Sequence, residues 1–302
     1  MVFTDIKNST KLWESASESM AVAVKEHFDV MRRQLRYIGG YEVKNEGDAM
    51  MASFSSVPSA MLWCLRVQEL LLGIDWPKEI LDSDEGKEIC CPKNTELTLY
   101  KGLSVRMGIH WGKPVSHKDE VTRRMDYYGP MVNRAARICN AADGGEICVS
   151  SDVMREVDKF ESLRDSDTPD AEHIREIEKM DFRMESMGEK KLKGLEAAET
   201  LYLLYPRRLG SRYDLTSAST AGTNGTVSRV LFFFFFFFFC VVIFTTSVSK
   251  ELIRSLSVLS FVSRNPLFLT ALLCEIYKQS HCGWSALFRE LWLHMGARRK
   301  KR

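Results

Sequence analysis

The stretch that decides the fold is Val43-Lys44-Asn45-Glu46-Gly47-Asp48-Ala49-Met50-Met51-Ala52. Two short segments flank the polar tip Glu46-Gly47-Asp48, which predicts a pair of antiparallel strands over 41–44 and 49–54, joined by a tight turn. Just upstream, Gly39-Gly40 is typical of the end of a helix. At the start of the chain, residues 2–6 predict another short strand.

Helices and strands follow one another in a regular order around this hairpin. Apolar residues spaced three and four apart predict an amphipathic helix that ends at Gly39-Gly40. Further helices are expected over 57–72 and 130–142, and strands over 103–109, 146–149, 183–186 and 200–204. The order strand–helix–strand–strand–helix–strand predicts an α+β fold of the ferredoxin-like, split βαβ kind. The polar segments 75–98 and 158–180 are expected to be insertions, the first of them loop-like.

The overall composition is that of a globular protein, with 45% hydrophobic and 27% charged residues. The net charge of +2 hides a division, because residues 1–206 carry −8 and residues 207–302 carry +10. An acidic front part excludes a nucleic-acid surface there. The eight cysteines form no C-x-x-C pair, so we expect reduced thiols. The chain starts without a signal-peptide pattern, and we therefore expect a cytoplasmic protein.

The charge division marks an expected domain boundary near residue 206. A Ser/Thr/Gly-rich linker is expected over 207–228, followed by a basic, Phe-rich tail over 229–302. Residues 230–244 are all apolar and include eight consecutive phenylalanines, which is shorter than the roughly 18–20 residues of a membrane span. Two interpretations stay open. Residues 230–246 form a membrane segment that anchors the protein, or the tail is a gene-model artefact, since a pyrimidine tract encodes a phenylalanine run.

Two carboxylates are candidate metal ligands. Asp5 lies near the end of the first predicted strand, and Asp48 lies in the hairpin turn. In a split βαβ fold the first strand lies beside this hairpin, so both carboxylates can converge at the sheet edge. Carboxylates, water and substrate phosphates are the ligands that Mg²⁺ prefers. The alternative is that Asp5 caps a helix and Asp48 serves only the turn.

Five segments carry a family resemblance, and they stand in this order: Phe3-Thr4-Asp5-Ile6-Lys7-Asn8-Ser9-Thr10, the stretch 43–52, Arg106-Met107-Gly108-Ile109-His110-Trp111-Gly112, Asp126-Tyr127-Tyr128-Gly129 and Val132-Asn133-Arg134-Ala135-Ala136-Arg137. Together they resemble the catalytic domain of class III nucleotidyl cyclases, most closely that of fungal adenylyl cyclases. The resemblance covers about residues 1–206. It implies that ATP is converted to 3′,5′-cyclic AMP and pyrophosphate.

The resemblance also implies roles for matching residues. Asp5 and Asp48 would hold two Mg²⁺ or Mn²⁺ ions in each active site. Lys44 would donate to a ring nitrogen of adenine, and Asp126 would accept from the exocyclic amine. In guanylyl cyclases a glutamate typically stands where Lys44 is, so Lys44 favours ATP.

Three further residues would handle the ribose and the phosphates. Asn133 would position the ribose, and Arg137 would stabilise charge on the α-phosphate; their spacing of four puts them on one helix face. Lys193 would bind the terminal phosphates, although Lys190 and Lys191 compete for this role. His110 is interpreted as a packed or surface residue rather than a general base.

The resemblance has consequences for assembly. In this family the site lies between two catalytic domains. This one chain carries the metal ligands as well as the residues for the base, the ribose and the phosphates, which predicts a homodimer with two equivalent sites. Regulatory regions of a longer cyclase are expected but not visible. The alternatives are a guanylyl cyclase, or an inactive dimerising or nucleotide-binding fragment of a larger cyclase.

Overall fold

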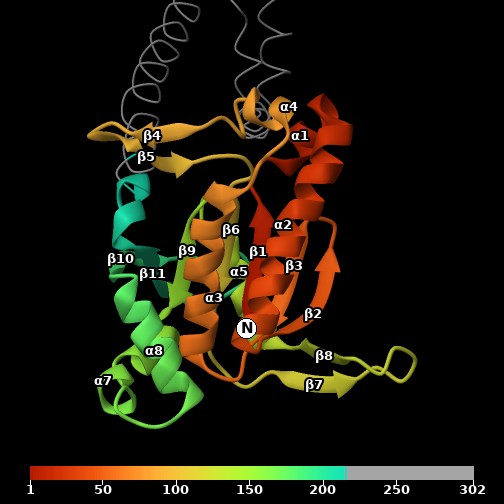
Figure 1. Ribbon diagram of the computed structural model, residues 1–302. Coiled ribbons are helices and arrows are strands. Elements are labelled where there is room, and N and C mark those ends of the chain that lie inside the picture. The colour runs from red at the N-terminus through yellow and green to blue at the C-terminus, as the bar shows by residue number, and fades with distance from the viewer. Residues whose placement is uncertain (214, 216–302) are drawn as a thin grey trace, which may run out of the picture. The chain divides into compact units, whose positions relative to one another are not determined.

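The computed structural model describes residues 1–213 and 215 (Figure 1). Its centre is a seven-stranded sheet of order β10-β11-β9-β6-β1-β3-β2, in which only β6 and β9 pair in parallel. This arrangement confirms the predicted α+β fold. The strands of this sheet are β1 (Val2–Ile6), β2 (Tyr41–Glu46), β3 (Ala49–Ser53), β6 (Val105–Ile109), β9 (Ile147–Ser150), β10 (Phe182–Lys190) and β11 (Glu199–Pro206).

Helices cover both faces of the sheet (Figure 1). The long helices α2 (Ser17–Ile38) and α3 (Val57–Leu70) pack over one face, where they share a core with Val2, Ile6 and Met107. The helix α5 (Pro130–Cys139) packs on the other face. Shorter helices complete the described part: α1 (Ser9–Ser15), η1 (Leu71–Gly73), α4 (Lys78–Leu81), α6 (Ser151–Val157), α7 (Phe160–Leu163), α8 (Pro169–Lys179) and η2 (Arg207–Leu209).

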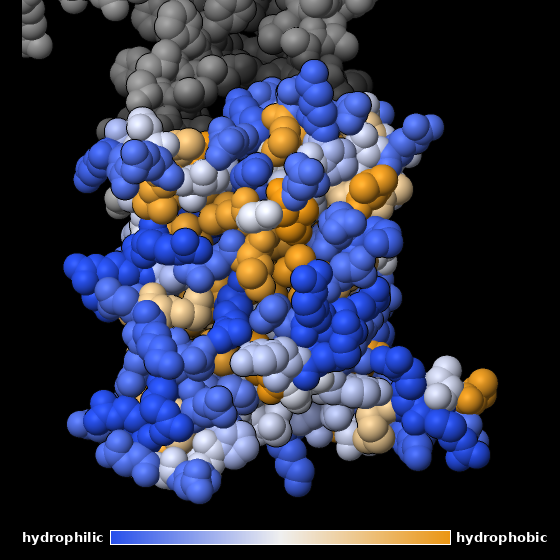
Figure 2. Space-filling model, viewed as in Figure 1, coloured by the Kyte–Doolittle hydropathy of each residue, from blue (hydrophilic) through white to orange (hydrophobic). Residues whose placement is uncertain are grey.

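The helix predicted to end at Gly39-Gly40 is confirmed as α2. Its inward residues recur at the predicted spacing and are buried, as Met20, Phe28 and Leu35 illustrate. Gly39 ends the helix with a φ of 88°, a left-handed conformation that glycine adopts without a steric cost. On the face that α2 and α3 cover, polar side chains dominate, and apolar residues show mainly where the upper parts of the two helices meet (Figure 2).

The helix α5 lies unusually close to the sheet at Gly108 in β6. A Cβ atom built on Gly108 would lie 2.2 Å from the backbone nitrogen of Cys139, so only glycine fits there. Alternation along β1 places Asp5 on the same face as Phe3, which packs on the α5 side of the sheet. The close approach at Gly108 therefore sets the distance between α5 and the strand that carries Asp5.

Both expected insertions contain regular structure, which corrects the loop-like prediction for residues 75–98. Residues 75–98 include α4 and much of a β-hairpin, β4 (Ile89–Cys91) and β5 (Asn94–Tyr100), anchored by the buried Trp76 and Ile80. Residues 158–180 include α7 and α8, and α8 buries Ile174 and Ile177 within the main core. The sequence looked polar because each segment buries only one narrow side.

A second β-hairpin was not predicted. Strands β7 (Val115–Lys118) and β8 (Met125–Tyr128) form a separate two-stranded sheet. Residues 207–213 pack onto the domain, with Leu209 and Arg212 buried. The rest of the expected linker, the tail and the segment 230–246 lie outside the described residues, so both interpretations of the tail and the boundary near 206 stay predictions. None of the helices in the described part is both long and apolar enough to cross a membrane.

Candidate active site

Asp48 lies beside the strand that carries Asp5. The register of β1 and β3 pairs Thr4 with Met50, so the turn after β2 brings Asp48 beside Ile6. The Asp48 Oδ2 atom accepts a hydrogen bond from the Ile6 backbone nitrogen at 3.3 Å. Both Asp5 and Asp48 are half-buried. Asp5 lies in β1 and Asp48 directly precedes β3, and both of these strands are interior strands of the sheet rather than edge strands.

Arg106 holds the carboxylate of Asp5, a contact that sequence reasoning missed. Its Nε atom donates to Asp5 Oδ2 at 2.9 Å, and its Nη2 atom donates to the same oxygen. Asp5 and Arg106 are direct partners in the register of β1 and β6. Arg106 stood in one of the segments that carry the resemblance, but only the strand pairing reveals that it faces Asp5.

The residues present fit a divalent cation that takes further ligands from substrate and water. Asp5 offers one carboxylate from β1, and Asp48 offers a second from the turn beside that strand. The part of the chain that the structure describes contains no group of three or more His, Cys, Asp or Glu side chains arranged to hold a metal. This donor set suits Mg²⁺, which is usually held by one or two carboxylates together with substrate phosphates.

Lys44 and Asp126, the two residues predicted to bind the adenine base, are also brought together. The Lys44 Nζ atom lies 3.1 Å from Asp126 Oδ1 and 3.2 Å from Asp126 Oδ2. Lys44 comes from β2 and Asp126 from β8, 82 positions later in the chain. Both side chains are substantially exposed, at 45% and 40%. The pair therefore presents a hydrogen-bond donor beside an acceptor on the surface.

The helix α5 carries the other two predicted residues. Asn133 and Arg137 lie one turn apart, on the side away from the buried Val132 and Ala135. Asn133 is exposed and Arg137 is half-buried. The shared face that their spacing predicted is thus present.

The residue predicted to bind the terminal phosphates lies in a loop. Lys193 is exposed between β10 and β11, next to the buried Leu192, and Gly194 follows with a φ of 80°. Lys190 ends β10, and Lys191 is likewise exposed. The choice of Lys193 among the three lysines stays a prediction.

His110 is packed, in agreement with its interpretation from the sequence. It is 4% exposed, and its Nδ1 atom lies 2.9 Å from the hydroxyl of Ser150. Burial lowers the pKa of His110 to about 4, although nearby Asp152 partly opposes this shift. A histidine in this environment is neutral at pH 7 and is enclosed by the core.

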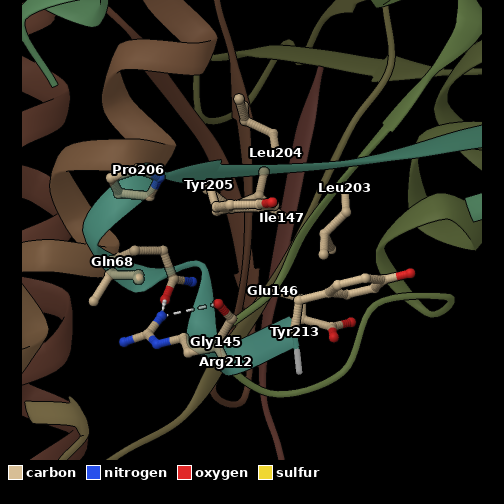
Figure 3. A pocket seen from close by; sticks show the side chains of 11 residues that line it. Gln68, Gly145, Glu146, Ile147, Leu203, Leu204, Tyr205, Pro206, Arg212 and Tyr213 are labelled. Carbon is tan, nitrogen blue, oxygen red and sulfur yellow. Dashed lines mark hydrogen bonds between the residues drawn. The ribbon is translucent and has the colours of Figure 1, made fainter. Parts of the chain in front are cut away.

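A small cavity lies elsewhere, between α3, the start of β9 and the segment after β11 (Figure 3). Its free volume is about 10 Å³, room for about one water molecule. The predicted site residues do not line it.

Known proteins share this domain. Residues 1–205 match the family described as adenylate and guanylate cyclase catalytic domain. Adenylate cyclase of Neurospora crassa is 49% identical over 237 residues, which cover 74% of this chain and 10% of that protein. Adenylate cyclase of Schizosaccharomyces pombe is 47% identical over 231 residues, covering 74% of this chain and 13% of that protein.

A solved structure shows the same fold. The structure of adenylate cyclases from Trypanosoma brucei in their monomeric state is 27% identical, with a TM-score of 0.55, and the match covers 67% of this chain and 86% of that one. The chain spans about a tenth of the length of the fungal relatives that it matches. The matched family model covers most of the described residues, and the chain belongs to the family of adenylate and guanylate cyclase catalytic domains.

Proposed function

We propose that this chain is the catalytic part of an adenylate cyclase, which converts ATP to 3′,5′-cyclic AMP and pyrophosphate by in-line attack of the ribose 3′ hydroxyl on the α-phosphate. The observation that carries the proposal is the contact between Lys44 and Asp126. The fungal relatives that cover most of the chain are named adenylate cyclase. The activity of the full-length protein is part of the same proposal.

The Lys44–Asp126 pair suits adenine. Adenine presents an acceptor at N1 and a donor at its exocyclic amine, so Lys44 donates to the first and Asp126 accepts from the second. Guanine presents the reverse pattern on the same edge, with an acceptor at O6 and a donor at N1. A lysine and an aspartate held in fixed positions therefore favour ATP over GTP.

Asp5 and Asp48 would hold the divalent cations that this family uses, which we propose are two Mg²⁺ or Mn²⁺ ions for each site. When bound, such ions supply a lowered pKa for the ribose 3′ hydroxyl and offset the charge on the leaving pyrophosphate. Arg106 keeps the Asp5 carboxylate oriented at the strand end. The Ile6 amide does the same for Asp48.

The remaining residues position the triphosphate and the sugar. Arg137 would stabilise the charge that develops on the α-phosphate, because a guanidinium presents several donors in a fixed plane. Asn133, one turn earlier, would hydrogen-bond the ribose. Lys193 would bind the terminal phosphates from its exposed loop. Phosphoryl transfer of this kind depends mainly on positioning and electrostatics.

We further propose a homodimer with two equivalent sites. Asp5 lies near the end of β1, whereas β8 packs through Tyr127 on a cluster that includes Met1, the residue directly before β1. One chain therefore presents the metal-binding carboxylates and the base readers at different places on its surface. In a dimer with a two-fold axis, the carboxylates of one copy would meet the base-binding residues of the other, so that each of the two active sites is complete. A cytoplasmic location, and regulatory regions elsewhere in a longer protein, are part of this proposal.

The direct test is cyclic nucleotide production by the purified 302-residue chain with Mg²⁺ or Mn²⁺, offering ATP and GTP separately. We expect cyclic AMP from ATP. We also expect Asp48→Ala to lower kcat by more than about 100-fold, because a lost metal ligand removes several kcal/mol of charge stabilisation. Asp84→Ala, at a carboxylate with 89% of its side chain exposed, is the matched control and should keep full activity.

Two outcomes would overturn the proposal. Cyclic GMP from GTP, without cyclic AMP from ATP, would identify a guanylate cyclase. A folded dimer that makes neither product would identify a non-catalytic fragment of a larger protein.

A further inference from the structure

The strand that carries Asp126 is not part of the main sheet. The hydrogen-bonded order of the seven-stranded sheet ends at β2, and β8 pairs only with β7 within the described residues. Lys44 and Asp126 therefore come from two sheets without a shared backbone ladder. Something other than strand pairing must hold the two side chains at a fixed separation.

The hydroxyl of Tyr41 makes that connection. It accepts a hydrogen bond from the Met125 backbone nitrogen at 3.1 Å and donates to the Met125 carbonyl at 3.3 Å. One side chain on β2 thus satisfies both main-chain groups of the residue directly before Asp126. Tyr41 is itself three positions before Lys44 on β2.

Two further contacts reinforce the same junction. Arg124 donates to the Glu42 carbonyl oxygen, and its guanidinium lies 5.6 Å from the centre of the Tyr41 ring. The rings of Tyr41 and Tyr127 pack against the same small apolar cluster, which includes Val43. The ring of Tyr41 serves packing and stacking, while its hydroxyl alone bonds the Met125 backbone.

We propose that Tyr41 is a positioning residue that sets the selectivity for adenine over guanine by holding β8 on β2. The inference rests on the proposed function, since it assumes that Lys44 and Asp126 read the base. Adenine and guanine present swapped donor and acceptor positions at C6 and N1. If Lys44 and Asp126 can shift by a fraction of the width of a base, they can bind the donor and acceptor pattern of either purine. If Tyr41 holds them in place, they match only the pattern of adenine.

The substitution Tyr41→Phe isolates the hydroxyl, because phenylalanine keeps the ring that packs and stacks. Each neutral hydrogen bond contributes a factor of about 2 to 10, so we expect the preference for ATP over GTP to fall about tenfold. The KM for ATP should rise, while kcat stays within about threefold, because α5 with Asn133 and Arg137 is untouched. Tyr37→Phe is the matched control, since Tyr37 is 72% exposed and keeps its ring over Arg66.

Binding gives a readout that does not depend on turnover. The analogues 2′,3′-dideoxy-ATP and 2′,3′-dideoxy-GTP lack the 3′ hydroxyl and cannot cyclise, so calorimetry on the full chain with Mn²⁺ measures the selectivity directly. The ratio of the two dissociation constants should move toward one in Tyr41→Phe. Arg124→Gln removes the guanidinium that bonds the Glu42 carbonyl and stacks on Tyr41, and it should move the ratio in the same direction by less.

The failures of the two proposals are distinguishable. If the unsubstituted chain prefers the adenine analogue and Tyr41→Phe keeps the same ratio, the role of Tyr41 is overturned and the proposed function stands. A lowered melting temperature with an unchanged ratio also overturns it, because Tyr41 would then be purely structural. If the unsubstituted chain shows no preference between the analogues, base reading by Lys44 and Asp126 fails first, and the role of Tyr41 fails with it.

Discussion

At the scale of single residues, two buried histidines stand out, because their burial opposes protonation. His27 on α2 is fully buried beside the ring of Phe28, and burial lowers its pKa to about 4. The backbone of Val24 partly opposes this shift, and the positive charge of Arg32 adds to it. His110 shows a pKa lowered to about the same value by the same cause.

This burial predicts a loss of stability in acid. An unfolded histidine takes up its proton near pH 6.5, whereas folded His27 does so only near pH 4. The free energy of unfolding is therefore highest above pH 6.5, where the histidine is neutral in both states, and it decreases as the pH falls toward 4. The shift corresponds to about 3 kcal/mol for His27. Urea titrations of His27→Leu should show a shallower fall over this range, with His110 supplying the remainder. His117→Leu, at an exposed histidine, should keep the full slope.

The candidate site illustrates what single residues reveal before a structure is known. Asp48, Lys44 and Arg137 could be named from their segments, since each segment combines a recognisable residue pattern with a fixed local spacing. Arg106 and Tyr41 could not be given their roles in the same way. Their partners, Asp5 and Met125, are 101 and 84 positions away in the sequence, and the contacts depend on how strands pair.

At the scale of elements, the segment 158–180 shows how a polar stretch can still belong to the core. The side chains of Ala171, Ile174 and Ile177 recur every three residues and are fully buried. The helix α8 is held against α3 by the ion pair between Arg66 and Glu176. Three apolar positions among polar neighbours are enough to bury one side of a short helix.

We therefore expect α8 to be needed for stability. Ile174→Ala should lower the free energy of unfolding by about 2–5 kcal/mol, as loss of a buried isoleucine side chain does in a packed core. Glu172→Ala, on an exposed side of the same helix, should change it by less than about 0.5 kcal/mol. Chemical denaturation of both variants measures the difference. Equal stability of the two would mean that α8 is the tolerated insertion that its polarity suggested.

At the scale of the whole described domain, Arg212 connects parts that are far apart in the chain. Its guanidinium donates to the Leu99 carbonyl at 2.6 Å. It also donates to Gln68 Oε1 at 2.8 Å and to the Gly145 carbonyl at 2.9 Å (Figure 3). It also stacks 4.9 Å from the Tyr100 ring. Burial lowers the pKa of Arg212 to about 10, so the side chain remains charged at neutral pH.

Removing this side chain should destabilise the domain strongly. Arg212→Ala leaves buried acceptors on α3, β5 and the loop before β9 without this donor, and each acceptor left unsatisfied costs about 1–3 kcal/mol. Arg208→Ala is the matched control in the same segment. Arg208 is 52% exposed in its pair with Glu69, so its loss should cost less than about 1 kcal/mol. If thermal unfolding shows similar small losses for both, residues 207–213 act only as a linker.

The shared site can be tested at the same scale by mixing two inactive chains. Asp48→Ala removes a metal ligand and Arg137→Ala removes the charge aimed at the α-phosphate, so each homodimer should lose both sites. Random pairing makes about half of the dimers mixed, and each mixed dimer keeps one intact site, so about a quarter of the wild-type cyclase activity should return. Absence of any recovery, with both chains shown to dimerise, would place the whole site within one chain.

The sequence by itself determined the family, the main helices and strands, and the residues proposed to bind metal, base and phosphate. These features rest on local patterns, because helical periodicity, a Gly-Asp turn and short motifs each lie within a few residues of chain. Only the tertiary structure decided that Arg106 holds Asp5, that Tyr41 joins β8 to β2, and that Arg212 bonds Gln68 from 144 positions away. Such contacts depend on strand register and on helix packing, which bring distant residues together and leave no periodic trace in the sequence.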